Sequence, residues 1–181
     1  KAQNCVSGSL ALKDFCDEHS INYDLVGKVV VATTEDELPA LQVLHERGTA
    51  NGVEGLKMIS KDELLEIEPH VNGIQALHCP KTGIIDYKEV SEAYAKVSRE
   101  NGVTIMMDTK LTGIHEYSES LLLETTKGPI RSSYIINCAG LYSDTVAKMM
   151  NKSLETQIIP FRGEYYTISD EKDYLVKGLI Y

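Results

Sequence analysis

Short apolar runs alternate with longer amphipathic stretches along this chain, and this alternation most constrains what it can fold into. Two stretches begin with Ser/Thr-x-x-Glu, at residues 34–37 (TEDE) and 60–63 (SKDE). In this pattern the hydroxyl and the carboxylate each bond backbone N–H groups of the first helical turn, so the pattern indicates a helix start. We call each Ser/Thr-x-x-Glu pattern a capping box. The Val-rich residues 25–33 precede the first box and residues 56–59 precede the second, and both runs have the composition of strands. The sequence therefore predicts a mixed α/β (α+β) fold.

The remaining segments continue the same alternation. Helices are expected over residues 2–18, from 38 to about 48–52, from 61 to 68, from 87 to about 99 behind an Asp86 cap, and from 141 to 150. Strands are expected over residues 25–33, 56–59, 74–79, 103–107, 111–115, 121–126, 130–137 and 158–166.

Composition excludes several classes of protein. With 181 residues, 43% of them hydrophobic, the chain can bury a core. Its net charge of -9 argues against a nucleic-acid or anionic-membrane surface. The four cysteines lack metal-ligand spacing and indicate reduced thiols of an intracellular protein, and the five histidines lack it too. No apolar run approaches the ~20 residues of a membrane span.

The run 160–166 (PFRGEYY) places a guanidinium in what is expected to be a strand. Pro160 weakens strand pairing on one side, and Gly163 permits close approach of another group. Arg162 between them would offer a fixed fork of donors that suits a carboxylate. An exposed Arg at the edge of a sheet explains the same pattern, and the residues alone leave both readings open.

A second run, residues 132–140 (SSYIINCAG), ends an apolar strand pattern in small residues before a helix pattern. Small residues at such a junction let a ligand approach the backbone of Cys138, Ala139 and Gly140. The N-terminus of the following helix favours an anion such as a phosphate. An ordinary strand-to-helix turn has the same appearance.

Taken together, these runs resemble the FAD-dependent L-2-hydroxyglutarate dehydrogenases of the D-amino-acid-oxidase-like flavoprotein superfamily. The resemblance rests on residues 137–144 (NCAGLYSD), 158–166 (IIPFRGEYY) and 174–181 (YLVKGLIY), with further matches at 27–32 (GKVVVA), 51–56 (NGVEGL) and 79–87 (CPKTGIIDY). The matches follow one order over nearly the whole chain. Glycerol-3-phosphate dehydrogenase-like and amino-acid-oxidase-like flavoenzymes share much of the pattern, and an isolated domain without activity is the non-enzymatic alternative.

The resemblance implies oxidation of a small 2-hydroxy acid to a 2-oxo acid, with FAD as the cofactor. It assigns substrate-binding roles to Arg162, Tyr165, Tyr87 and Lys177, with Arg162 as the carboxylate clamp. It assigns cofactor-binding roles to Leu111, Cys138, Ala139, Gly140 and Leu141. A phosphate substrate would need several convergent cations, whereas this chain offers mainly Arg162. The general base and the electron acceptor are not assigned, and none of the five histidines matches a base motif.

The resemblance also implies a division between two domains. Residues 1–20 and 87–150 are expected to belong to the flavin domain, and residues 21–86 and 151–181 to a mixed-sheet substrate domain. The chain begins at Lys1 without a methionine and contains no Gly-x-Gly-x-x-Gly, the fingerprint that supplies the pyrophosphate site near the family's N-terminus. We therefore expect an internal fragment that does not retain FAD and is inactive alone.

The cellular setting of the parent protein is implied in the same way. The resemblance predicts an intracellular protein, mitochondrial in a eukaryote and cytoplasmic or inner-membrane-associated in a bacterium. Peripheral attachment of the parent to a membrane is left open by the sequence.

Overall fold

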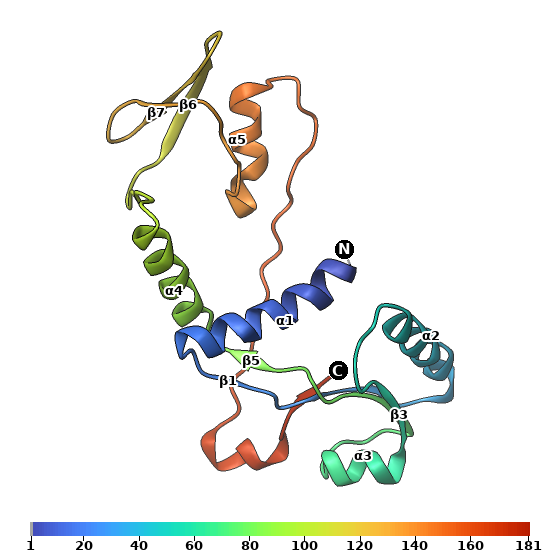
Figure 1. The fold of residues 1–181 in the computed structure, drawn as a ribbon. Coiled ribbons are helices and arrows are strands. Elements are labelled where there is room, and N and C mark those ends of the chain that lie inside the picture. The colour runs from blue at the N-terminus through green and yellow to red at the C-terminus, as the bar shows by residue number, and fades with distance from the viewer. Residues whose placement is uncertain (1) are drawn as a thin grey trace. The chain divides into compact units, whose positions relative to one another are not determined.

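A computed structural model describes residues 2–181; Lys1, where the first expected flavin-domain part begins, lies outside the described residues. The chain forms two compact units, shown as a ribbon in Figure 1. Unit 1 comprises the chain up to Gly102 together with Thr167–Tyr181, and unit 2 comprises Val103–Tyr166. The expected assignment of segments to a flavin and a substrate domain stays a prediction.

Helices and strands alternate through most of the described chain. The helices are α1 (Ala2–His19), α2 (Leu38–Ala50), α3 (Lys61–Ile67), α4 (Tyr87–Glu100) and α5 (Ser143–Met150), with short 3-10 turns η1 (Glu35–Glu37), η2 (Gly140–Tyr142) and η3 (Asp170–Leu175). The strands are β1 (Tyr23–Asp24), β2 (Lys28–Ala32), β3 (Lys57–Ser60), β4 (Gln75–Cys79), β5 (Ile84–Ile85), β6 (Leu111–Glu116), β7 (Leu121–Thr125), β8 (Ile130–Ser132) and β9 (Leu179–Ile180). The mixed α/β fold class is confirmed.

The main sheet of unit 1 has four strands in the order β3-β4-β2-β9. β2 pairs antiparallel with β4 and parallel with β9. Successive side chains of a strand point to opposite faces, so Val29 packs with Leu64 of α3 while Ala32 packs with Leu41 of α2. The two helices thus cover opposite faces of the sheet, which explains why the β2 sequence KVVVA is apolar at both alternating sets of positions.

A second core in unit 1 joins α1 to α4 and to the small β1-β5 sheet. Cys16 of α1, Ile21 and Val90 of α4 are buried together there. The rings of Phe15 and Tyr94 stack with centroids 4.4 Å apart, which adds a second contact between the two helices. This core fixes α1 beside β5, and the cavity described below lies between these two elements.

One carboxylate is buried in unit 1, at the end of α3. Glu68 is 1% exposed, and its oxygens accept the backbone N–H groups of Lys177 at 3.0 Å and Gly178 at 2.6 Å. A buried carboxylate needs such donors, because it has lost the water that would otherwise bond it. Glu68 therefore holds the segment that leads into β9 against the end of α3.

Unit 2 consists of the antiparallel sheet β6-β7-β8, with α5 packed against β6, and a long extended segment. Residues 151–169 contain no helix or strand. Several apolar side chains of unit 2 are almost fully exposed, among them Phe161 at 91% and Tyr166 at 100%. Such exposure is unusual for side chains of this size, which normally find a partner surface.

Local signals in the sequence predict the helices well. The box at residues 60–63 is confirmed, since Ser60 and Glu63 bond each other's backbone N–H groups at the start of α3. At residues 34–37, the Glu37 carboxylate accepts the Thr34 N–H at 3.3 Å, and the 3-10 turn η1 comes before α2. Asp86 caps α4 as expected, with its carboxylate accepting the Lys88 N–H at 2.8 Å.

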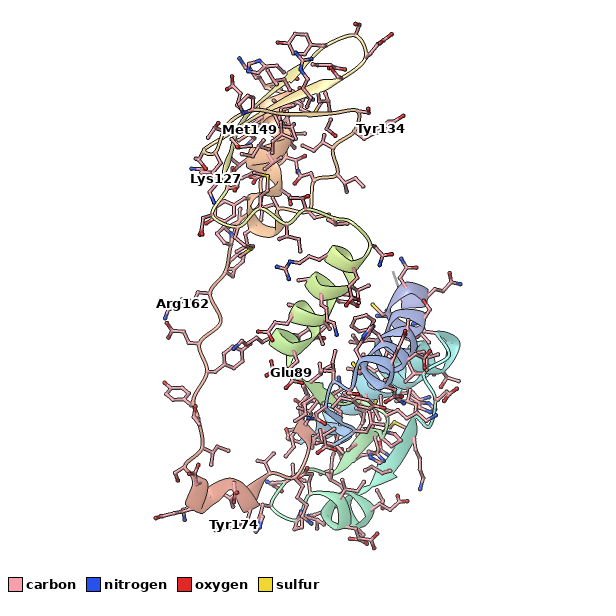
Figure 2. The ribbon with its side chains drawn as sticks, turned by 60° about the vertical axis from the view of Figure 1, so that its left-hand side comes forward. Glu89, Lys127, Tyr134, Met149, Arg162 and Tyr174 are labelled. Carbon is pink, nitrogen blue, oxygen red and sulfur yellow. The ribbon has the colours of Figure 1, made fainter. Side chains whose placement is uncertain are left out.

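Three of the expected strands are wrong in whole or in part. Residues 103–107 and 158–166 form no strand, and the strand expected over residues 130–137 ends at Ser132. A strand exists only where another strand bonds it, and the described residues of these segments have no ladder partner. Tyr134 and Ile136, expected in the interior of a strand, are 85% and 86% exposed (Figure 2 labels Tyr134).

The cap of α3 gives a testable dependence on pH. A hydrogen bond from Lys57, together with those from Ser60, lowers the pKa of Glu63 to about 2. Because the folded pKa lies below the unfolded value of about 4.3, the charge of Glu63 stabilises the fold above that value. This stabilisation is lost as the pH falls toward 2. In thermal unfolding from pH 7 to pH 2, we expect Glu63→Gln to be less stable than the wild type at neutral pH and equal to it at the acid end.

Glu66→Gln is the matched control, since Glu66 lies exposed on the same helix. The difference in stability between Glu66→Gln and the wild type should not shrink as the pH falls from 7 to 2. A difference between Glu63→Gln and the wild type that stays constant over the whole range would show that the charge of Glu63 does not contribute.

Candidate functional site

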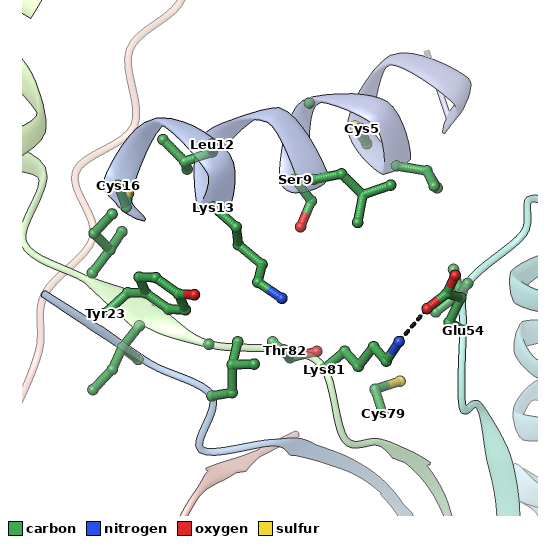
Figure 3. Close-up of a pocket in the computed structure, with 18 of the residues that line it drawn as sticks. Cys5, Ser9, Leu12, Lys13, Cys16, Tyr23, Glu54, Cys79, Lys81 and Thr82 are labelled. Atoms are coloured by element: carbon green, nitrogen blue, oxygen red, sulfur yellow. Dashed lines mark hydrogen bonds and ion pairs between the residues drawn. The ribbon is translucent and has the colours of Figure 1, made fainter. Parts of the chain in front are cut away.

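Unit 1 contains a cavity of about 620 Å³ between α1, β5 and the turn that follows α2 (Figure 3). This volume falls within the range of ligand-binding pockets in proteins. The side chains on its walls are mainly apolar: Val6, Leu10 and Leu12 from α1, Leu25, and Ile84 and Ile85 from β5. The packing of α1 against β5, described above, determines the shape of the cavity.

Three charged side chains line the cavity. Lys81 donates to the carboxylate of Glu54, and this bond lowers the pKa of Glu54. Lys13 projects from α1 into the same space (Figure 3). Among residues 2–181, no carboxylate oxygen lies within 4.0 Å of the Lys13 Nζ. The cavity therefore has one positive charge that is not compensated by a direct ion pair.

Two of the thiols on the cavity wall are poor nucleophiles. Burial raises the pKa of Cys16 and of Cys79, so both stay protonated at neutral pH. The Tyr23 hydroxyl donates to Asp17 at 3.1 Å, and burial together with this bond raises the pKa of Tyr23. These groups give the cavity polar surface without an activated nucleophile or base.

The four expected substrate-binding residues do not meet in this cavity. Tyr87, the first residue of α4, lines it and is 66% exposed. Lys177 belongs to unit 1 and has an exposed side chain, while its backbone N–H is bonded by Glu68. Arg162 and Tyr165 belong to the extended segment of unit 2 (Figure 2 labels Arg162). Their roles in binding substrate stay predictions.

The structural setting expected for Arg162 is wrong. Instead of lying in a strand, Arg162 has a side chain that is 87% exposed, and its Nε lies 3.6 Å from a carboxylate oxygen of Glu164. Tyr165 is 94% exposed. Because no strand forms over residues 158–166, neither side chain is positioned by a strand ladder.

The expected cofactor-binding residues lie in unit 2, at the turn before α5 and at the start of β6. Cys138, Ala139, Gly140 and Leu141 follow an extended segment rather than the expected strand. Gly140 has a φ of +57°, and a Cβ at this position would meet no atom within 4 Å. The turn is held from within, since the Asn137 carboxamide accepts the Ala139 N–H at 3.2 Å and donates to the Ser143 carbonyl at 2.8 Å.

Leu111, the fifth expected cofactor residue, opens β6 and is half-buried. The backbone at Gly140 is thus open to approach, as a nucleotide-binding turn requires. That these five residues bind a cofactor stays a prediction.

Comparison with known proteins decides the family. The model of the family described as "FAD dependent oxidoreductase", abbreviated DAO, matches residues 2–180. The chain belongs to this family. The expected resemblance to the D-amino-acid-oxidase-like flavoproteins is therefore confirmed.

Curated relatives narrow the resemblance further. The chain is 47% identical over 182 residues to L-2-hydroxyglutarate dehydrogenase of Indibacter alkaliphilus, an alignment that covers 100% of this chain and 46% of that protein. It is 38% identical over 193 residues to the human mitochondrial L-2-hydroxyglutarate dehydrogenase and 37% identical over 182 residues to the Escherichia coli protein of the same name. Both alignments cover 100% of this chain. They cover 42% of the human protein and 43% of the Escherichia coli protein. The chain thus spans less than half the length of the curated relatives it matches.

Solved structures agree with the fold. L-proline dehydrogenase from P. horikoshii matches with a TM-score of 0.78 and 20% identity, over 84% of this chain and 42% of that one. L-alpha-glycerophosphate oxidase from Mycoplasma pneumoniae, solved with FAD bound, matches with a TM-score of 0.67 and 31% identity, over 71% of this chain and 36% of that one. The former supports the fold alone.

Sequence reasoning missed the cavity in unit 1. Its walls come from α1, the turn after α2 and the β4–β5 connection, which are distant in sequence and share no motif. The available signals were two of the runs that carry the family resemblance, residues 51–56 and 79–87. Three members of the first run and seven of the second line the cavity: Gly52, Val53 and Glu54, and Cys79, Lys81, Thr82, Gly83, Ile84, Ile85 and Tyr87. No group of three or more His, Cys, Asp or Glu side chains suited to a metal ion occurs within residues 2–181. None of the helices described is long and apolar enough to cross a membrane.

Proposed function

We propose that this chain forms part of an FAD-dependent enzyme that oxidises L-2-hydroxyglutarate to 2-oxoglutarate. The observation that carries the proposal is 47% identity, over the whole of this chain, to a protein named for that activity. Membership of the family of FAD dependent oxidoreductases supports the reaction class.

The residues around Gly140 fit a nucleotide cofactor. The positive φ of Gly140 and the open space beside it would let a ligand touch the backbone where a side chain would block it. We propose that Cys138, Ala139, Gly140 and Leu141, with Leu111, contribute to holding FAD. When bound, FAD supplies the electron acceptor for oxidation of the substrate carbon.

The substrate requires cationic partners, since L-2-hydroxyglutarate carries two carboxylates and the chain as a whole carries a net charge of -9. We propose Arg162 as the residue that binds one carboxylate through two parallel N–H···O bonds. Its present contact with Glu164 is a 3.6 Å approach between exposed groups, which contributes little and which a substrate carboxylate can replace. Lys177, Tyr165 and Tyr87 are proposed as further substrate contacts.

The names of the relatives support a proposal for the compartment of the complete enzyme in a eukaryote only. Its compartment is proposed to be the mitochondrion if the source is a eukaryote, as five curated relatives from eukaryotes carry the word mitochondrial in their names. For a bacterial source we propose the cytoplasm or the inner membrane, with peripheral attachment. The electron acceptor beyond the flavin is not assigned.

The proposal is tested by the colour of the flavin. A polypeptide of the relatives' length that contains this chain should purify with a flavin absorbance band, and anaerobic L-2-hydroxyglutarate should bleach it. The enantiomer D-2-hydroxyglutarate is the matched control and should leave the band unchanged. Absence of flavin, or a band that L-2-hydroxyglutarate does not bleach, would contradict the proposal.

A second candidate is oxidation of glycerol 3-phosphate, because a glycerophosphate oxidase structure is 31% identical to this chain. In the same experiment, bleaching by glycerol 3-phosphate but not by L-2-hydroxyglutarate would establish that alternative.

A further inference from the structure

The cavity of unit 1 has the features of a binding site for a ligand other than the 2-hydroxy acid, although one residue of its lining, Tyr87, is also a proposed substrate contact. Its walls are formed by the side chains of Val6, Leu10, Leu12, Leu25, Ile84 and Ile85. L-2-hydroxyglutarate is a small polar dianion, which such walls would not favour. They suit a ligand with an aliphatic body, because its burial removes apolar surface from water on both sides.

The charged side chains of the cavity indicate which polar group the ligand carries at the end of its aliphatic body. Lys81 and Glu54 compensate each other through a direct bond. Lys13 adds a second ammonium with no carboxylate of the described residues in ion-pair contact. It is partly buried on α1 and points into the cavity (Figure 3). The bond from Lys81 lowers the pKa of Glu54 and the charge of Lys13 also contributes to lowering it, so Glu54 attracts both lysines of the lining. Two lysines and one glutamate give the lining a net charge of +1, which matches one negative charge, and not the two or three of a phosphate ester or a tricarboxylate.

Polar groups beside Lys13 can complete the site. The hydroxyls of Ser9 on α1 and Thr82 before β5 line the same cavity, and neither side chain has a hydrogen bond to another group among residues 2–181. A carboxylate accepts several hydrogen bonds and is best held by an ammonium together with hydroxyl donors.

From these observations we propose that the cavity between α1 and β5 binds an aliphatic monocarboxylate, with its carboxylate at Lys13 and its chain against the apolar walls. Its anchoring residue, Lys13, is not among the proposed contacts of the 2-hydroxy acid, although the cavity shares the lining residue Tyr87 with them.

The test uses the chain of residues 1–181 and two probes of equal length, octanoate and 1-octanol, in isothermal titration at neutral pH. Octanoate should bind about tenfold more tightly than octanol, which is the effect of one charge-assisted hydrogen bond. Equal affinities for the two probes, or no binding of octanoate, would overturn the proposal.

Three variants locate the site. Lys13→Met should weaken octanoate by about tenfold and leave octanol unchanged. Lys61→Met is the matched control, because Lys61 is an exposed first residue of α3 outside the cavity, and it should bind octanoate like the wild type. Leu10→Asn alters an apolar wall residue that is 53% exposed, so it should fold normally and weaken both probes. Unchanged octanoate binding in folded Lys13→Met would show that the carboxylate lies elsewhere.

Discussion

Replacing Glu68 by alanine is expected to lower the free energy of unfolding of this chain by about 3 kcal/mol. The carboxylate is 1% exposed and accepts two backbone N–H groups, from Lys177 and Gly178. Its removal leaves both donors without a partner in a place with little access to water, and an unsatisfied buried donor costs more than the bond itself contributed. The segment leading into β9 should detach before the rest of unit 1 unfolds.

Chemical denaturation of the wild type, Glu68→Ala and Glu66→Ala measures this effect. Glu66 lies exposed on α3 two residues earlier, so its replacement should change the free energy of unfolding by less than about 0.5 kcal/mol. Hydrogen exchange provides a local readout, since the amides of Lys177 and Gly178 should exchange faster in Glu68→Ala only. If Glu68→Ala and Glu66→Ala were equally stable, the buried carboxylate would not be the anchor of this segment.

In the complete enzyme, Arg162→Lys is expected to lower kcat/KM for L-2-hydroxyglutarate by a factor on the order of tens to hundreds. Lysine keeps the positive charge but loses the planar pair of donors that grips both oxygens of a carboxylate. Losing one strong bond to a charged group costs about 2–4 kcal/mol, and each 1.4 kcal/mol is a tenfold change. Steady-state kinetics, normalised to the flavin content of each sample, measure the loss.

The alternative role for Arg162 is a simple ion pair with Glu164, the contact present in this structure. Under that alternative, Arg162→Lys and Glu164→Gln would change the thermal midpoint slightly and leave kcat/KM at the wild-type value. Arg47→Lys is the matched control, because Arg47 is exposed on α2. A kcat/KM for Arg162→Lys equal to that of Arg47→Lys would remove Arg162 from the substrate site.

The parts of the fold that could be predicted are those whose information is local. The N-terminus of α3 depends on Ser60 and Glu63, three residues apart, and that of α4 depends on Asp86 and Lys88, two residues apart. Both could be predicted from the sequence, because the side chain that caps a helix bonds backbone N–H groups within the first turn. Strands β2 and β4 could also be predicted. Helices cover both faces of their sheet, so the two strands are apolar along most of their length.

The wrong strands show the opposite case. Residues 158–166 have the apolar and aromatic composition of a strand, but composition cannot supply the second strand that a ladder requires. In this chain no described residue pairs with them, and Phe161 is left 91% exposed. The short β8 was overextended for the same reason, because its pairing with β7 ends at Ser132.

For the candidate sites, the sequence indicated residue types but not their arrangement. Gly140 could be singled out because a small residue before a helix has a local meaning, and its positive φ agrees with that reading. Glu68 could not, since an acidic residue before Pro69 looks like any solvated helix end, and its bonding partners lie 109 and 110 residues further along the chain. Lys13 on its own likewise looks like one more exposed helical lysine until α1 is placed against β5.

The parallel pairing of β2 with β9 sets an order of events during synthesis. β2 is made early, but its partner at Leu179–Ile180 follows only after all of unit 2 has been made. Until then one edge of the sheet presents unpaired N–H and C=O groups, a surface prone to pairing with another chain. The sheet of unit 1 can therefore be completed only after the ribosome has synthesised unit 2 and β9. The nascent chain is most prone to aggregation or chaperone binding between the synthesis of β2 and that of β9.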